Sequence, residues 1–222
     1  TLHVPTGRTD AYAADETFKV FTQVEEFDPP YVKIYNLHIA GIRVTNINAS
    51  DILGDGAASY DASTKTMTIK GDITAPDDNT PCVKSNIDGL TINVTSAATL
   101  SATNYAIYLE ADATITGSSQ LTANASADKG YGIYRPSANH PITITGANLV
   151  VGGKITCDYI TNSTVSASGV IGSNSNLSID NSTVSVNQGL SGGTYTSTLS
   201  ITNSHITATS GLYSIGAIYG YL

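Results

Sequence analysis

Apolar residues recur along the chain with a period of about 22 residues. In the clearest copies an isoleucine is followed, five positions later, by a second apolar residue, with mostly polar residues between them. These copies are Ile144–Leu149, Ile160–Val165, Ile179–Val184 and Ile201–Ile206. The looser copies lead with Ile69, Ile92 and Ile115, and the mean separation of all seven leading isoleucines is 22 residues. A β-rich repeat of this length predicts a solenoid.

Short strands account for most of each repeat. Leu177-Ser178-Ile179 and Leu199-Ser200-Ile201 alternate with period two, which indicates strands with one buried face. A further short strand is expected before the leading isoleucines, at Tyr105–Leu109, Tyr131–Tyr134, Gly169–Ile171 and Gly211–Ile215. The fixed Leu-x-x-Leu-x-Leu frame of a leucine-rich repeat is missing. We therefore predict an all-β fold, a right-handed single-stranded parallel β-helix of about seven coils.

One turn of the repeat carries asparagine. Asn162, Asn181 and Asn203 occupy equivalent positions. Asparagine tolerates the left-handed conformation of a sharp corner, and its amide can bond to the next asparagine in a ladder. We interpret this row as structural and not as a ligand site.

The N-terminal third lacks the repeat. A strand at 2–5 and one or two helical turns within 9–15 are expected, and Asp28-Pro29-Pro30 marks a linker. Residues 31–65 are predicted to form a β-hairpin cap, because the end of a β-helix exposes unpaired strand edges. A helical turn at 48–53 and a hairpin of residues 59–69 belong to this prediction. Residues 66–222 then form the β-helix, and the apolar end 217–222 is expected to be covered by a terminal strand, a partner or further chain.

Composition narrows the function. Charged residues make up 13% of the chain and the net charge is −8, whereas about 25% charged residues is typical. No segment clusters basic residues, so binding to nucleic acid or to an anionic membrane surface is not expected. No run of 18 apolar residues exists, which argues against membrane insertion. Cys82 and Cys157 could pair or remain buried thiols, and they lack the neighbours of a zinc site.

Two family resemblances appear. Leu2–Gly7, Asp10-Ala11-Tyr12 and Phe18–Phe21 resemble the closing segment of BspA-type leucine-rich-repeat regions, with Phe18 where tryptophan is usual. The resemblance implies that residues 1–30 are the end segment of an upstream leucine-rich-repeat region and a linker. The chain starts at Thr1 without a leader, so we expect either a removed signal or a piece of a longer protein.

The second resemblance covers residues 35–71 and the coils beyond. The run from Leu37 to Thr45, with Asn48–Gly56 and Thr66–Ile69, is similar to a cell-surface module of gut anaerobic bacteria. In that module, coils containing Tyr-Gly-Ile-Tyr and Leu-Thr-Ile follow, as at Tyr131–Tyr134 and Leu90–Ile92. The resemblance implies a pectate-lyase-like β-helix without an assigned activity, acting as an adhesin or in carbohydrate binding. It provides no catalytic residues.

Catalytic and metal sites find little support in the sequence. Asp112, Asp128 and Asp158 share no evident coil position, although a catalytic carboxylate pair must lie within about 5 to 10 Å. We therefore predict a non-catalytic protein that needs no cofactor. Calcium is the one possible ion, with Asp72, Asp77 and Asp78 as weak candidates; the alternative is a solvated loop.

Tyrosine is the most suggestive residue type, with 13 copies and no tryptophan. Period-two alternation places Tyr108 and Tyr134 on the face opposite Ile107 and Ile133. Together with Arg135 they are the candidate ligand-binding residues, because exposed rings suit the C–H faces of sugars. The alternative is that the rings pack across coils and only stiffen the wall. Extra residues at 125–130 and 136–141 should leave the wall as loops and could add to a site.

The sequence thus predicts a protein located extracellularly or on the outer cell surface. Its expected partner is a glycan or a host or microbial surface. Two other hypotheses stay open: a structural stalk that presents upstream repeats, and a polysaccharide lyase or hydrolase on a β-helix.

Overall fold

The computed structural model describes residues 1–222 except 6, 28–30, 174, 193–196, 214–216 and 221–222. It is all-β, and α1 (Thr9–Ala13) is the one α-helix among these residues. The chain divides into two compact units, Thr1–Lys33 and Ile34–Leu222.

The first unit pairs two short strands in parallel. β1 (Leu2–Pro5) pairs with β2 (Val24–Phe27), and α1 lies between them in the sequence. The predicted strand at 2–5 and helical turns within 9–15 are confirmed. Val4 is buried, and the Tyr12 and Phe18 rings meet edge to face at 5.2 Å between centroids.

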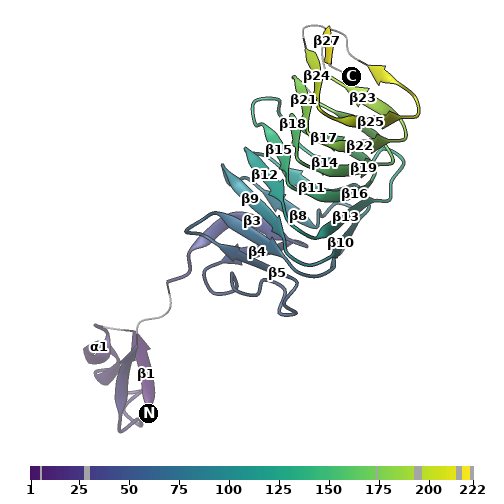
Figure 1. The fold of residues 1–222 in the computed structure, drawn as a ribbon. Coiled ribbons are helices and arrows are strands. Elements are labelled where there is room, and N and C mark those ends of the chain that lie inside the picture. Colours follow the sequence, from purple (N-terminus) through teal and green to yellow (C-terminus); the bar gives the residue numbers. More distant parts are fainter. Residues whose placement is uncertain (6, 28–30, 174, 193–196, 214–216, 221–222) are drawn as a thin grey trace. The chain divides into compact units, whose positions relative to one another are not determined.

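The second unit consists of three sheets dominated by parallel strands (Figure 1). Sheet I contains β7 (Ile73–Thr74), β10 (Ala98–Ala102), β13 (Gln120–Ala125), β16 (Asn148–Gly152), β19 (Thr164–Ala167), β22 (Thr183–Val186) and β25 (His205–Ala208). Sheet II contains β4 (Ile42–Thr45), β3 (Ile34–Ile39), β8 (Val83–Ser85), β11 (Tyr105–Leu109), β14 (Tyr131–Tyr134), β17 (Lys154–Thr156), β20 (Val170–Gly172), β23 (Gly189–Ser191) and β26 (Leu212–Tyr213). Sheet III contains β5 (Ala58–Asp61), β6 (Thr66–Ile69), β9 (Leu90–Val94), β12 (Ala113–Thr116), β15 (Ile142–Thr145), β18 (Tyr159–Thr161), β21 (Leu177–Asp180), β24 (Thr198–Thr202) and β27 (Ala217–Gly220).

Consecutive strands from β6 onward enter sheets III, I and II in turn. Each strand then pairs in parallel with the strand three places on, and we call three consecutive strands, one per sheet, a rung. This arrangement agrees with the predicted period, since one rung consumes about one repeat. The inward side chains of all three sheets form one hydrophobic core.

The predicted isoleucine column is present in sheet III. Strand register aligns successive isoleucines, and all but the last are fully buried: Ile92, Ile115, Ile144, Ile160, Ile179 and Ile201. The prediction was wrong for Ile69, which pairs with Val94, while Met67 pairs with Ile92. The shift is by two residues, so the same strand face stays inward.

The corner between sheets III and I is held by two side-chain ladders. Asn162, Asn181 and Asn203 have φ of 49°, 46° and 47°, in the left-handed region expected of them. The amide of Asn181 donates to Oδ1 of Asn162 at 2.7 Å, which confirms the predicted asparagine ladder for this pair.

A serine follows each asparagine and forms the second ladder, which the sequence analysis missed. The backbone N–H of Ser163 donates to Oγ of Ser182, and that of Ser182 to Oγ of Ser204, at 3.2 and 3.1 Å. Each serine hydroxyl in turn donates to the carbonyl two residues earlier. These buried groups are therefore satisfied from rung to rung.

Antiparallel strands occupy the N-terminal edges of sheets II and III. β3 pairs antiparallel with both β4 and β8, and β5 pairs antiparallel with β6 as the predicted hairpin. The predicted helical turn at 48–53 is wrong, because Asp51 instead accepts N–H bonds from Gly54 and Gly56 in a series of turns. At the other end β27 pairs with β24, and Tyr221 and Leu222 lie outside the described residues.

The two cysteines are free, buried thiols. The Cys82 thiol donates to the carbonyls of Ile73 and Ser101 at 3.3 and 3.2 Å. Burial raises the pKa of Cys82 to about 11 and raises the pKa of Cys157 as well. Both thiols therefore stay protonated and unreactive near neutral pH.

Candidate binding surface

The solvent side of sheet II carries a group of four tyrosines. Parallel register pairs Tyr105 with Tyr131 and Tyr108 with Tyr134 between β11 and β14. Their neighbours Ile107 and Ile133 point inward and are fully buried, while the four rings are half-buried. The predicted outward orientation of Tyr108 and Tyr134 is therefore confirmed.

The four rings contact one another and form what we call the tyrosine cluster. Centroid distances are 6.1 Å for Tyr105–Tyr131, 5.3 Å for Tyr108–Tyr134 and 4.6 Å for Tyr131–Tyr134. Desolvation, followed by neighbouring charged and phenol groups, raises the pKa of Tyr108 and Tyr134. Both phenols are thus neutral near pH 7 and can donate as well as accept hydrogen bonds.

Two lysines flank the tyrosine cluster. Lys84 Nζ lies 5.3 Å from the Tyr108 ring centroid, and Lys154 Nζ lies 5.3 Å from that of Tyr131. Both are cation–π distances. Lys84 also lies 3.5 Å from a carboxylate oxygen of Glu110. The register explains the contacts, since Lys84 pairs with Tyr108 and Lys154 with Tyr131 in adjacent strands.

A polar hollow of about 200 Å³ adjoins the cluster at Lys84. It forms where the antiparallel strand β3 meets the first parallel strand of the sheet, β8, and its lining residues are Asn36, His38, Lys84, Asn86 and Glu110. His38 pairs with Lys84 across the two strands, so one row of side chains runs from His38 through Lys84 to Tyr108 and Tyr134.

Arg43 extends this row by one strand. It pairs with His38 between β3 and β4, and its Nε–H donates to His38 Nε2 at 3.4 Å. Desolvation, and then the positive charges of Arg43 and Lys84, lower the pKa of His38. His38 is therefore neutral near pH 7, and Nε2 acts as an acceptor.

Sequence reasoning missed His38, Arg43, Lys84 and Lys154 as members of this surface. They are spread from residue 38 to residue 154, and only strand register makes them neighbours. Extending the tyrosine alignment one rung in each direction would have placed Lys84 beside Tyr108 and Lys154 beside Tyr131.

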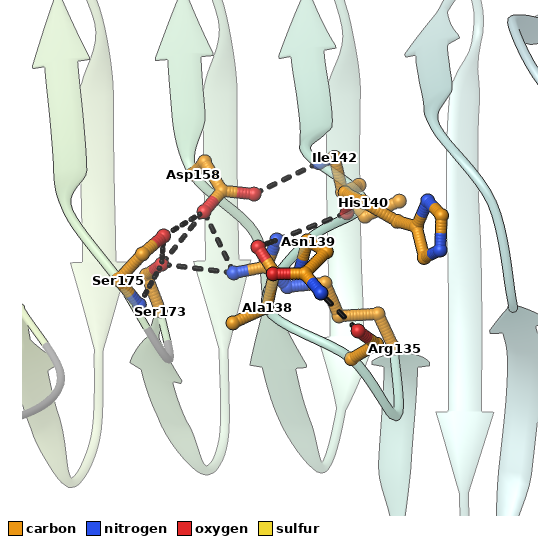
Figure 2. Close-up of polar contacts among 9 residues, drawn as sticks. Arg135, Ala138, Asn139, His140, Ile142, Asp158, Ser173 and Ser175 are labelled. Atoms are coloured by element: carbon orange, nitrogen blue, oxygen red, sulfur yellow. Dashed lines mark hydrogen bonds and ion pairs between the residues drawn. The ribbon is translucent and has the colours of Figure 1, made fainter.

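Arg135 does not belong to the tyrosine surface, and its prediction as a lining residue is wrong. Its side chain is 0% exposed and points under the loop that follows β14 (Figure 2). One guanidinium nitrogen, Nη2, lies 2.7 Å from Asp158 Oδ1 and donates to Ser173 at 3.0 Å. The other, Nη1, donates to the carbonyls of Ala138 and His140 at 3.4 and 2.9 Å. Period-two alternation places Arg135 on the inward side with Ile133, and the prediction was wrong because it grouped Arg135 with the outward-facing Tyr134. The buried carboxylate of Asp158 pairs with the guanidinium there.

Asp158 completes this buried network. Its Oδ1 also accepts hydrogen bonds from the hydroxyls of Ser173 and Ser175, and its Oδ2 accepts a hydrogen bond from the backbone N–H of Ile142 at 2.9 Å. Arg135 Nε is the one buried side-chain polar atom without a partner among the described residues. The network ties the loop 136–141 to the next two rungs.

The other acidic candidates are engaged individually. His140 Nδ1 lies 3.1 Å from Asp112 Oδ1, and Asp128 is exposed in the loop after β13. Asp158 is held by Arg135 as described above. No contact among the three carboxylates is found in the described part of the chain.

The three calcium candidates each accept hydrogen bonds from the protein, Asp77 within its own turn and the other two from residues of a later strand or loop. Asp72 accepts the Thr99 N–H, and Asp77 accepts the N–H groups of Asn79 and Thr80. Asp78 accepts the Thr103 hydroxyl at 2.8 Å. Among the described residues, no group of three or more His, Cys, Asp or Glu side chains is placed to hold a metal.

Comparison with protein-family models, with curated proteins and with solved structures finds no match to this chain. Within the described ranges, no helix is both long and apolar enough to cross a membrane.

Proposed function

We propose that the second unit is a right-handed single-stranded parallel β-helix of about seven coils with a β-rich N-terminal cap. The support is the strand order, in which consecutive strands visit three sheets in turn and pair in parallel one rung later. Sheet I has seven such strands. Parallel crossovers in one sheet are right-handed in about 98% of cases, which supports the hand.

We further propose that this protein is a non-catalytic module of the bacterial cell surface that binds carbohydrate. The observation that carries the proposal is the tyrosine cluster, with rings that are half-buried on the solvent side of sheet II. Apolar ring faces can receive sugar C–H groups, and the phenol oxygens can bond to sugar hydroxyls. The adjacent hollow adds amide, imidazole, ammonium and carboxylate groups, which are the polar groups that orient a ligand.

Rigid placement favours the same reading. Tyr105, Tyr108, Tyr131 and Tyr134 project from paired strands whose opposite face is packed in the core, so little ordering entropy remains to be lost on binding. The hypothesis of a structural stalk stays open, because the ring contacts would also stiffen the wall. An enzyme on this fold is disfavoured, since the carboxylates that could form a pair are held by other residues.

A glycan array probed at high protein concentration tests the proposal. We expect binding to one group of related glycans. Tyr134→Ala should lower the affinity about tenfold, since stacking of a ligand on one aromatic ring contributes on the order of 1–3 kcal/mol. The matched control is Tyr159→Ala, because Tyr159 is 48% exposed but lies in sheet III. An array without hits, or hits that Tyr134→Ala and Tyr159→Ala weaken equally, would overturn the proposal.

A further inference from the structure

The polar hollow and the tyrosine cluster share Lys84. This lysine lines the hollow, and its Nζ lies over the Tyr108 ring at 5.3 Å from the centroid. A ligand that lies along the row from His38 to Tyr134 would therefore meet Lys84 and the rings together. The groups that line the hollow therefore affect which carbohydrates can bind at the tyrosine cluster.

The charge of this face is opposite to that of the chain. The net charge of the protein is −8, yet Arg43, Lys84 and Lys154 all project from sheet II, and Glu110 contacts Lys84. Among the described residues, no ion pair to Lys154 or Arg43 is found. A mainly cationic face within an acidic protein favours a negatively charged ligand.

The one ion pair on this face is weak enough to rearrange. Lys84 and Glu110 lie 3.5 Å apart, with side chains 44% and 32% exposed. Partly exposed pairs of this kind are held loosely because water screens them. Lys84 can thus turn from Glu110 to a ligand anion without leaving a buried charge unpaired.

We propose that the hollow is the subsite for the acidic group of an anionic glycan, with Lys84 binding the carboxylate or sulfate and Tyr108 and Tyr134 contacting the adjoining sugar. Asn36 and Asn86 line the same hollow and supply amide groups for sugar hydroxyls. Glu110 opposes the anion and limits the affinity. This assignment rests on the proposed carbohydrate binding and specifies the class of carbohydrate.

Pairs of polysaccharides that share a sugar chain but differ in charge distinguish recognition of the charge from recognition of the sugars. Binding of the full chain is measured by calorimetry to polygalacturonate and to its fully methyl-esterified form, and to dextran sulfate and dextran. We expect the charged member to bind about tenfold or more tightly in at least one pair, with affinity falling as salt rises from about 50 to 500 mM. The pair that responds distinguishes a carboxylate from a sulfate.

Two substitutions in the ion pair should act in opposite directions. Lys84→Gln should weaken binding of the charged polysaccharide about tenfold, because a charged hydrogen bond is lost. Glu110→Gln should strengthen it about two- to threefold, because the opposing carboxylate is removed. Lys70→Gln is the control, since Lys70 is exposed, follows β6 of sheet III and makes the same change in charge.

The outcomes are distinguishable. Equal binding of charged and neutral members, or weaker binding by both Lys84→Gln and Glu110→Gln, overturns the acidic subsite while carbohydrate binding stands. Binding of none of the four polysaccharides together with an empty array overturns both proposals. A single-stranded oligonucleotide that binds more tightly than the polysaccharides would show a general polyanion surface and would also overturn the assignment.

Discussion

The early and late rungs of the second unit share one strand arrangement but differ in their aromatic and charged side chains. Rungs that include β8, β11, β14 and β17 bear the tyrosine cluster, the cations and the Arg135 network. From residue 163 to the end, Asp180 is the only acidic or basic residue besides His205, and serine, threonine and asparagine fill the polar positions. Both regions share the inward column of aliphatic side chains.

The difference separates two tasks. Stacking one rung on the next requires small polar side chains at corners and aliphatic side chains inside, and these make up most of the late rungs. Charged side chains and a cluster of aromatic rings are not needed for stacking, so their presence on one face of the early rungs supports the proposed role in binding. Substitutions in each region test whether the two tasks are separate.

The ion pair of Arg135 and Asp158 lies among the early rungs and should be the most sensitive point. Arg135→Ala leaves the Asp158 carboxylate buried without its cation, so we expect a loss of about 3–5 kcal/mol in the free energy of unfolding. Urea denaturation followed by circular dichroism measures it. Lys129→Ala, an exposed change in the preceding loop, is the control and should alter stability by less than about 0.5 kcal/mol. Equal stability of the two variants would contradict the stabilising role of the ion pair between Arg135 and Asp158.

The core column should respond equally in both regions. Ile115→Ala in an early rung and Ile179→Ala in a late rung each empty a fully buried site. We expect each to cost about 2–5 kcal/mol, from lost burial plus the cavity left behind. The same urea titration measures both, and a loss near zero for Ile179→Ala would mean that the late rungs do not share the core.

The asparagine corner belongs to the late rungs. Asn181→Ala places a Cβ-bearing residue without a side-chain bond at φ of 46° and removes the 2.7 Å bond to Asn162, so a loss of about 1–2 kcal/mol is expected. Asn181→Gly removes only the bond and should cost less. Thermal unfolding of the two variants compares them, and a glycine variant less stable than the alanine variant would contradict the role of the left-handed turn.

Much of this architecture was predictable because it depends on repetition. The isoleucine spacing, the positive-φ asparagines and the pairing of Tyr108 with Tyr134 all follow from aligning one repeat on the next. Departures from the repeat were harder to predict from the sequence. Ile69 pairs with Val94 instead of Ile92, next to the antiparallel strand β5. The buried partner of Arg135 is Asp158, 23 residues later, which the repeat does not specify.

The candidate site was only half predictable for the same reason. The tyrosines are repeated residues, whereas His38, Lys84, Lys154 and Glu110 each occur once at their strand position. The net charge gave no sign of a cationic surface, because the chain as a whole is acidic and its basic residues are scattered in the sequence. Strand register, and not composition, brings them onto one face.

The smallest expected effect concerns the thiols. Burial raises the pKa of Cys82 to about 11 from an ordinary value of about 9. The folded state therefore holds a proton that the unfolded state releases, and this contribution to stability is present below about pH 9 and lost as pH rises through 11. A thiol reagent at pH 8 should leave both cysteines unmodified in the folded protein and modify both in urea. Rapid labelling without urea would contradict the buried state.

Hydrogen–deuterium exchange with and without the polysaccharide that binds tests the central claim most directly. Binding on the early rungs predicts slower exchange in peptides that cover β8, β11, β14 and β17, and unchanged exchange across β19, β21, β22 and β24. Protection centred on the late rungs, or none at saturating polysaccharide, would contradict the account.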